Sequence, residues 1–139
     1  MISFNYQEAD LVLDEDKHLL WLKRAVLEEG QIINEIAYIL TTDEEVLALN
    51  KKFLRHDYYT DILTFDRSEN QRLSGDIFIS QERVEENAAT HEVEKGEELR
   101  RVMIHGLLHM MGYKDDSEED RRIMREREDY YLKMFHVEQ

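Results

Sequence analysis

Residues 99–112, LRRVMIHGLLHMMG, decide how this chain folds, because they combine a long apolar run with two regularly spaced histidines. Apolar residues occupy nearly every side of the helix that this stretch predicts from about Glu94 onward, and such a helix is usually buried in a protein core. Gly112 readily adopts the left-handed backbone that ends a helix. The sequence therefore predicts a central buried helix that stops at Gly112.

Strands and helices are predicted on both sides of this helix in the chain. The predicted strands are residues 2–6, 32–41, 61–65 and 75–79, and a polar loop, 67–74, can close a hairpin between the last two or connect them as sheet neighbours. The other predicted helices are residues 17–29, 42–53, 80–88 and 116–134, with Gly30 ending the first and Thr42, Ser80, and Asp116 or Ser117 capping the others. We expect an α+β fold in which helices flank a small mixed sheet.

The composition fits one domain over residues 1–139, since 42% hydrophobic residues supply one core and 36% charged residues supply an ionised surface. The sequence holds no cysteine, so any metal must be bound through His, Asp or Glu. The first residues lack a basic leader followed by a long apolar run, and no apolar run of about 18 residues occurs. We therefore expect a soluble, cytoplasmic protein that does not associate with membranes.

The formal net charge of −14 opposes binding to polyanions, because a phosphate-binding surface normally needs clustered Lys and Arg. The charge is distributed unevenly: residues 1–50 carry −8, residues 51–72 carry +1 and residues 73–139 carry −7. The middle segment, which holds Lys51, Lys52, Arg55 and His56, is therefore where we expect phosphate contacts. The alternative is a solvated helix face, which we favour for the two lysines.

His105 and His109 are four residues apart on the predicted buried helix, so their imidazoles lie on one face and can converge on one metal ion. Zinc peptidases use the same spacing, but the glutamate that serves them as general base is replaced here by Gly106. A glycine inside a helix costs about 1 kcal/mol relative to alanine. Its position indicates that either substrate or a packed neighbour approaches closely there.

A catalytic zinc site normally has three protein ligands, so a third must come from outside the helix. Gly112 can turn the chain so that residues 114–116 return toward His109, and we predict Asp115 as the third ligand with Asp116 as the alternative. A structural interpretation uses the same residues, because two buried histidines can simply be hydrogen-bonded core residues and Asp116 can cap the final helix.

Residues 105–115, HGLLHMMGYKD, resemble the signature of the YbeY endoribonuclease family of rRNA maturation factors, whose pattern HGxLHxxGYDH supplies three zinc-binding histidines. Residues 50–65 and 75–77 are similar to the substrate-side segment of that family and to the strand that follows it. Two positions depart from the pattern. Asp115 replaces the third histidine, with Lys114 in place of the family's aspartate, and the family's arginine falls on Leu54, with Arg55 one position later. Since carboxylates also bind zinc, we expect the site to survive with a changed charge.

The resemblance implies a single-strand-specific, metal-dependent endoribonuclease of the cytoplasm that binds one zinc ion per chain through His105, His109 and Asp115. It implies ribosomal RNA as substrate and the small ribosomal subunit and its proteins as partners, because family members mature the 3′ end of small-subunit rRNA and act in ribosome quality control. It also implies catalytic roles for His105 and Arg55. Such an ion can polarise a phosphoryl oxygen or acidify a bound water.

Three other functions would use some of the same residues. A non-catalytic, metal-bound ribosome assembly factor is compatible with the acidic ends, which suit contact with basic proteins. A zincin-like peptidase would share the histidine pair but would need a base from another element, and an iron oxygenase would use two histidines and one carboxylate. The sequence leaves the RNA cleavage position, the native metal and the oligomeric state undetermined.

Overall fold

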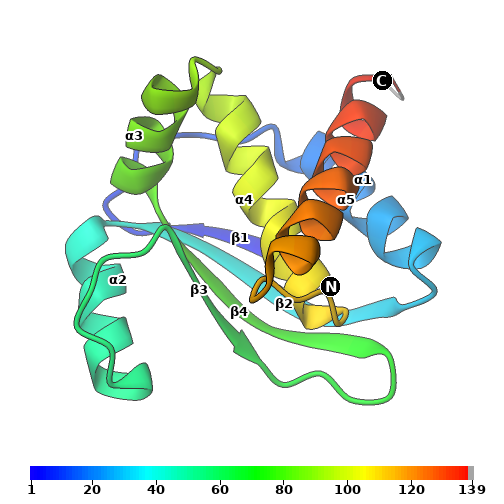
Figure 1. Ribbon diagram of the computed structural model, residues 1–139, viewed down its shortest axis with the longest axis horizontal. Helices are drawn as coiled ribbons and strands as arrows, with labels where there is room; N and C mark the ends of the chain where they lie inside the picture. Colours follow the sequence, from blue (N-terminus) through cyan, green and yellow to red (C-terminus); the bar gives the residue numbers. More distant parts are fainter. Residues whose placement is uncertain (138–139) are drawn as a thin grey trace.

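Four strands form one mixed sheet in the computed structural model, which describes residues 1–137 (Figure 1). The strands are β1 (Ile2–Tyr6), β2 (Ile32–Thr41), β3 (Ile62–Asp66) and β4 (Arg72–Ser80), and their order across the sheet is β1-β2-β4-β3. β1 pairs with β2 and β2 pairs with β4 in parallel, whereas β3 and β4 are antiparallel. Of the two connections predicted between the last two strands, the hairpin is the one observed.

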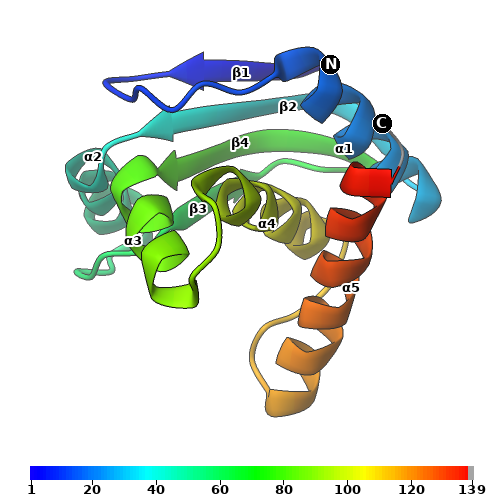
Figure 2. The same ribbon diagram turned by 90° about the horizontal axis from the view of Figure 1, so that it is seen from above.

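The helices are α1 (Glu15–Glu28), α2 (Asp43–Leu49), α3 (Gln81–His91), α4 (Lys95–Met110) and α5 (Glu118–Val137), and a π-helical turn, η1 (Asn50–Leu54), follows α2 directly. α1, α3, α4 and α5 lie on one side of the sheet, and α5 projects away from the strands (Figure 1 and Figure 2). The predicted α+β fold with a small mixed sheet is confirmed. Within residues 1–137, no helix is both long and apolar enough to span a membrane.

The two faces of the sheet are covered by different elements, because successive residues of a strand point to opposite sides. Ile77 of β4 is completely buried on the side of α4. Phe78 points to the other side, where its ring lies 5.8 Å from that of Phe65, and Phe65 lies 5.7 Å from Phe53 of η1, measured between centroids. The α2 and η1 segment therefore covers part of the second face.

α4 is the central helix that the sequence predicts. Its buried apolar side chains are Leu99, Val102, Met103, Ile104, Leu107, Leu108 and Met110. They belong to one cluster with residues of the sheet, α1 and α5. The Tyr38 hydroxyl of β2 donates to the Met103 carbonyl at 2.9 Å, and the Trp21 indole of α1 donates to the Tyr131 carbonyl of α5 at 2.7 Å. These bonds satisfy the polar atoms of two aromatic residues inside the core.

Gly106 allows α4 to approach the sheet closely. A Cβ atom at this position would lie 2.9 Å from the Cδ1 atom of Ile62 and 3.4 Å from side-chain atoms of Ile77. The sequence left open whether substrate or a packed neighbour requires this glycine, and the structure shows packed neighbours. Glycine lowers the helix propensity of α4, but the lack of a Cβ atom allows α4 to pack closely on β3 and β4.

Capping side chains set the start of two helices. α1 begins two residues earlier than predicted because the Asp14 carboxylate accepts a hydrogen bond from the Lys17 N–H at 3.3 Å. α5 is capped by Ser117, whose hydroxyl accepts from the Asp120 N–H at 3.0 Å while the Asp120 carboxylate accepts from the Ser117 N–H at 3.3 Å. This reciprocal pair is a capping box, so Ser117 rather than Asp116 is the cap.

Irregular backbone conformations shift two further element boundaries from their predicted positions. β4 begins at Arg72 instead of residue 75, because Asn70 and Gln71 adopt left-handed backbones, with φ of 51° and 60°, and close a tight hairpin turn. The helix predicted over residues 42–53 becomes π-helical at Asn50 and ends where Arg55 takes a left-handed backbone, with φ of 57°. The hairpin turn and the π-helical end both depend on backbone geometry that cannot be predicted from the spacing of apolar residues.

Gly75 of β4 offers a test of close packing in this region. A Cβ atom there would overlap the Phe65 carbonyl oxygen and lie 3.1 Å from the Cε atom of Met110. Because a backbone atom cannot rotate away, we expect Gly75→Ala to lower the free energy of unfolding by roughly 1–3 kcal/mol. Urea unfolding followed by circular dichroism measures this change.

Gly96→Ala is the matched control, because its Cβ would meet only the flexible end of Arg100, at 3.4 Å. We expect this substitution in the first turn of α4 to be neutral or to stabilise the protein by up to about 1 kcal/mol. Equal effects of the two substitutions would show that overlap with the Phe65 carbonyl is not the cause.

Candidate metal centre

The structure brings His105, His109 and Asp115 together at the end of α4. The Oδ2 atom of Asp115 lies 3.7 Å from Nε2 of His105 and 3.9 Å from Nε2 of His109. One donor atom from each residue lies within 4.8 Å of the others, so the group could hold a metal ion. Asp116, the alternative third ligand, is not part of this group among the described residues.

Gly112 turns the chain back so that Asp115 reaches the histidines. Its backbone is left-handed, with φ of 104°. The N–H groups of Gly112 and Tyr113 donate to the carbonyls of His109 and Leu108 at 3.1 and 3.0 Å, respectively. These hydrogen bonds close the end of α4 in the way that a glycine C-cap does. The turn predicted from the sequence is therefore present.

Glu29, which follows α1 directly, ties this turn to the rest of the protein. Its carboxylate accepts hydrogen bonds from the Tyr113 hydroxyl at 2.8 Å, from the Arg127 guanidinium at 2.7 Å and from the Tyr131 hydroxyl. The Glu29 side chain is only 13% exposed. Burial raises the pKa of this carboxyl, but the three donors outweigh burial, so the pKa of Glu29 is lowered overall. Tyr113 is thereby fixed two residues before Asp115.

Glu128 of α5 fixes the ring of His105. Its buried carboxylate accepts from Nδ1 of His105 at 2.6 Å and from the Arg101 guanidinium at 2.8 Å. Because an ionised carboxylate only accepts, Nδ1 carries a hydrogen, and in the neutral ring Nε2 is left free to bind a metal. Burial lowers the pKa of His105, but the hydrogen bond and charge of Glu128, with the charges of Asp115 and Asp61, raise that pKa overall.

A cavity of about 600 Å³ opens beside His105 and Asp115. Its other polar lining residues come from α3, α4, α5 and the start of β3, and they are Asp61, Asn87, His91, Glu98, Arg101, Glu118, Arg121, Arg122, Arg125 and Glu128. Burial raises the pKa of the Asp61 and Glu98 carboxyl groups. The cavity therefore combines buried acids with a wall that carries several arginines.

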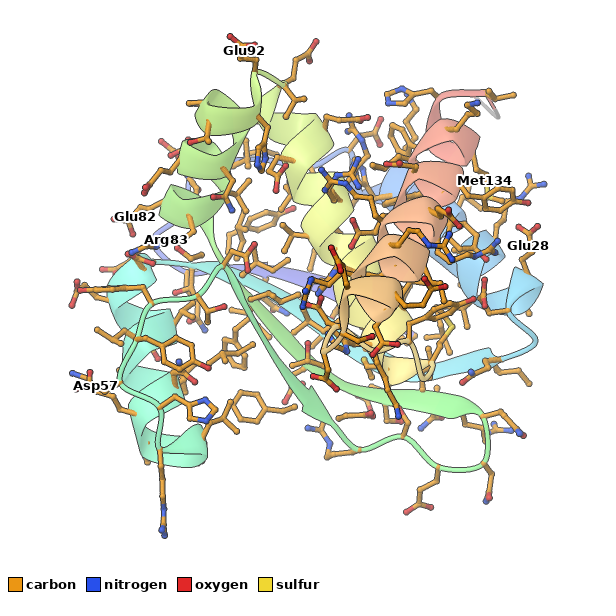
Figure 3. The ribbon with its side chains drawn as sticks, viewed as in Figure 1. Glu28, Asp57, Glu82, Arg83, Glu92 and Met134 are labelled. Atoms are coloured by element: carbon orange, nitrogen blue, oxygen red, sulfur yellow. The ribbon has the colours of Figure 1, made fainter. Side chains whose placement is uncertain are left out.

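Arg55, the predicted catalytic arginine, does not line this cavity. Its side chain is exposed and has no ion-pair partner within residues 1–137. Of its neighbours, Lys51 pairs with exposed Asp57 at 3.4 Å, and Lys52 lies over the ring of Phe53 at 5.2 Å. Asp57 lies at the outer edge of the molecule (Figure 3), and η1 is well separated from the turn between α4 and α5 (Figure 1). Lys51, Lys52, Arg55 and His56, the cations of the predicted phosphate-binding segment, therefore lie outside the cavity beside His105.

Comparisons with known proteins identify the family. A family model described as Endoribonuclease YbeY matches residues 3–136. The chain belongs to this family of endoribonucleases. It is 46% identical to Endoribonuclease YbeY of Flavobacterium psychrophilum, over 100% of this chain and 99% of that protein, and 46% identical to the protein of the same name from Flavobacterium johnsoniae, over 100% of both. A solution structure from Thermotoga maritima matches with a TM-score of 0.70 and 27% identity, over 99% of this chain and 91% of that one.

The third position of the YbeY ligand pattern is an aspartate in this chain, and the geometry accommodates it. Two imidazole nitrogens and one carboxylate oxygen are a donor set that catalytic zinc sites use. A tetrahedral ion with bonds of about 2.0–2.2 Å separates its ligand atoms by roughly 3.3–3.6 Å. The observed Asp115 separations of 3.7 and 3.9 Å lie slightly above this range, and all three donor atoms lie within 4.8 Å of one another. The residues present therefore fit the metal that the YbeY resemblance implies.

No motif in the sequence indicated the site roles of Glu29, Arg101 and Glu128. Glu128 lies 23 residues after His105, in a helix with many acids, so no local motif distinguishes it. A signal was nevertheless present, because Glu128 follows Met124 by four residues and precedes Tyr131 by three, which places it on the apolar face of α5. A buried acid of that kind needs a partner.

Glu29 gives the site a measurable pH dependence of stability. Its folded-state pKa lies below its ordinary value of 4.5, so the ionised form stabilises the protein above that pH, and the contribution is lost as pH falls through the folded-state pKa. We expect Glu29→Gln to cost roughly 1–3 kcal/mol of unfolding free energy at pH 7 and much less at about pH 3. Urea unfolding at both pH values measures the difference.

Glu28→Gln is the control for Glu29→Gln. The Glu28 side chain is exposed and accepts a hydrogen bond from Tyr130, so its replacement should change stability little at either pH. If the cost of Glu29→Gln were the same at pH 7 and at about pH 3, the ionised carboxylate would not be its origin.

Proposed function

We propose that this chain is a metal-dependent endoribonuclease that cuts single-stranded ribosomal RNA, and that it acts in maturation of the 3′ end of small-subunit rRNA and in ribosome quality control. The observation that carries the proposal is the group of His105, His109 and Asp115 beside a cavity, in a chain that matches the YbeY family over residues 3–136. Residues 1–139 act as one hydrolase domain in the cytoplasm, with the small ribosomal subunit and its proteins as partners.

We assign one zinc ion per chain to His105, His109 and Asp115. Support comes from the donor set, from the spacing of the donor atoms and from the carboxylate of Glu128 behind His105. His105, His109 and Asp115 would hold the ion, which when bound would supply Lewis acidity toward a phosphoryl oxygen or a water molecule. His105 thus has its catalytic role as a ligand, and Glu128 holds its ring in the orientation that this role requires.

The remaining roles concern binding of the RNA strand. The cavity beside the histidines has room for a nucleotide, and its charged walls come from three helices. Arg55 lies outside the cavity, so we assign it to an outlying phosphate of an extended strand, which its planar guanidinium can grip in two places. This contact would serve longer substrates more than short ones.

Three other functions would require features that differ from those of an endoribonuclease. A peptidase of the zincin type needs a general base beside the first histidine, and Gly106 there is packed against Ile62 and Ile77. That packing leaves little space for an acid at this position. A metal-bound assembly factor would bind the small ribosomal subunit without cutting RNA. An iron oxygenase would share the ligand set but would need iron and a cosubstrate.

Substitution of the proposed ligands tests the metal assignment. We expect about one zinc ion per chain, lost in His105→Ala, His109→Ala and Asp115→Ala and kept in Asp116→Ala, because Asp116 lies outside the group. Glu128→Gln should keep the fold and weaken zinc binding by roughly 10–100-fold. Elemental analysis after dialysis and a competition titration measure these changes. Loss of zinc in Asp116→Ala with retention in Asp115→Ala would move the third ligand by one residue.

A cleavage assay tests the proposed activity. The zinc-loaded protein should cut a single-stranded RNA that carries the 3′ end of small-subunit rRNA, chelator treatment should abolish cutting, and added zinc should restore it. His105→Ala purified in the same way controls for contaminating nucleases. Equal cutting by this variant would refute the assignment, and binding to the small subunit without any cutting would favour the assembly factor.

A further inference from the structure

We propose that Arg121 and Arg125 of α5 form a phosphate-binding wall of the cavity and hold the RNA backbone beside the metal ligands. The proposal rests on the function proposed above, and it identifies residues that contact the substrate. These residues lie in a helix with six acidic residues and five Lys or Arg residues, outside the segment of positive charge that the sequence favoured for phosphate binding.

α5 presents one continuous face to the cavity. The residues of α5 that line it include Glu118, Arg121, Arg125 and Glu128, which recur every three or four positions and therefore share one side of the helix. At the inner end of this row, Glu128 binds His105 at 2.6 Å. Arg125 precedes Glu128 by three residues, a rise of about 4.5 Å along the axis, so it lies within one turn of the residue that supports the metal centre.

Two of the four arginines that line the cavity are already occupied by carboxylates. Arg101 is paired with Glu128 at 2.8 Å. Arg122 bridges Glu119 and Glu126 on its own helix, the latter at 2.6 Å. Their guanidinium groups would have to break existing ion pairs to bind a phosphate.

The other two arginines, Arg121 and Arg125, have guanidinium groups that can bind a phosphate without breaking an ion pair within residues 1–137. Arg125 is exposed and pairs with no carboxylate within residues 1–137. Arg121 is also exposed, and its guanidinium donates at 3.0 Å to the backbone carbonyl of Asp116, which leaves most of its donors unused. A guanidinium with free donors at the edge of a cavity is suited to bind a phosphate in a bidentate manner.

The charge of the cavity supports a phosphate ligand. Five carboxylates and four arginines line it, so one bound divalent cation gives it a formal charge of +1, although the whole chain carries −14. In an acidic protein, this is a site where an RNA phosphate meets both a metal ion and unpaired arginines. α5 also projects away from the sheet (Figure 2), and Arg121 and Arg125 are exposed, so an approaching strand can reach their side chains.

The test measures binding of zinc-loaded protein to a labelled single-stranded RNA made with 2′-O-methyl and phosphorothioate groups, which resists cutting but keeps its charge. Fluorescence anisotropy gives the affinity at several salt concentrations. We expect Arg125→Ala and Arg121→Ala each to reduce the slope of log affinity against log salt by about 0.7, which corresponds to about fourfold weaker binding at 0.15 M salt. Zinc content should stay unchanged in both variants.

Two further variants separate this wall from a general effect of net charge and from a phosphate contact at η1. Lys133→Ala removes one charge from an exposed position of α5 outside the cavity, so it should leave the slope unchanged. Arg55→Gly suits the left-handed backbone at that position and should weaken binding of a long RNA but not of one of about six nucleotides. Arg125→Ala should weaken binding of both.

Several results would overturn the proposal. If Arg125→Ala and Lys133→Ala weakened RNA binding equally, the effect would come from net charge and not from a phosphate-binding wall. If only Arg55→Gly weakened RNA binding, the phosphate contact would lie at the end of η1. If the parent protein cuts RNA and both α5 variants bind it equally well, the wall fails while the proposed function stands. If the zinc-loaded parent neither binds nor cuts RNA, both fail together.

Discussion

The contact of Gly106 with the side chains of Ile62 and Ile77 sets both the depth and the rotation of α4 on the sheet. Successive residues of an α-helix are about 100° apart around the axis, so turning the glycine toward the strands fixes where His105 and His109 point. His105 then lies beside the sheet edge formed by β3 and lines the cavity. The close approach of α4 to the sheet at Gly106 thus positions the donor atoms of His105 and His109. The turn at the end of the same helix adds the donor atom of Asp115.

Two carboxylates from distant parts of the chain hold this arrangement in place. Glu29 binds Tyr113 and so fixes the turn, while Glu128 binds His105 and so fixes a ring. Both are largely buried and both also accept from an arginine, Arg127 and Arg101 respectively. Because breaking one partner of a buried pair leaves an uncompensated charge, each pair resists local change. The last helix therefore serves the site as a support, not only as a cover for the core.

The parts of the fold and site that the sequence predicted are those encoded over a few neighbouring residues. Helical spacing of His105 and His109, the glycine at position 112 and the capping pattern at Ser117 each act within one or two turns, so their geometry follows from position alone. Glu29 and Arg125 gain their roles from contacts that join α1 to α5 and α5 to the cavity. Such contacts depend on the packing of whole helices, which residue spacing does not specify.

Net charge and local charge have separate consequences in this protein. At physiological ionic strength the Debye length is about 8 Å, so an approaching RNA strand responds mainly to charges within that distance. The outer surface, which accounts for most of the net charge of −14, repels the strand over most of the molecule. With the proposed cation bound, the cavity would reverse this repulsion where the ion acts together with Arg121 and Arg125, which have no carboxylate partner within residues 1–137. An acidic exterior around a locally positive cavity would therefore restrict RNA to the site where it can be cut, so the overall charge opposes non-specific binding without excluding an RNA substrate.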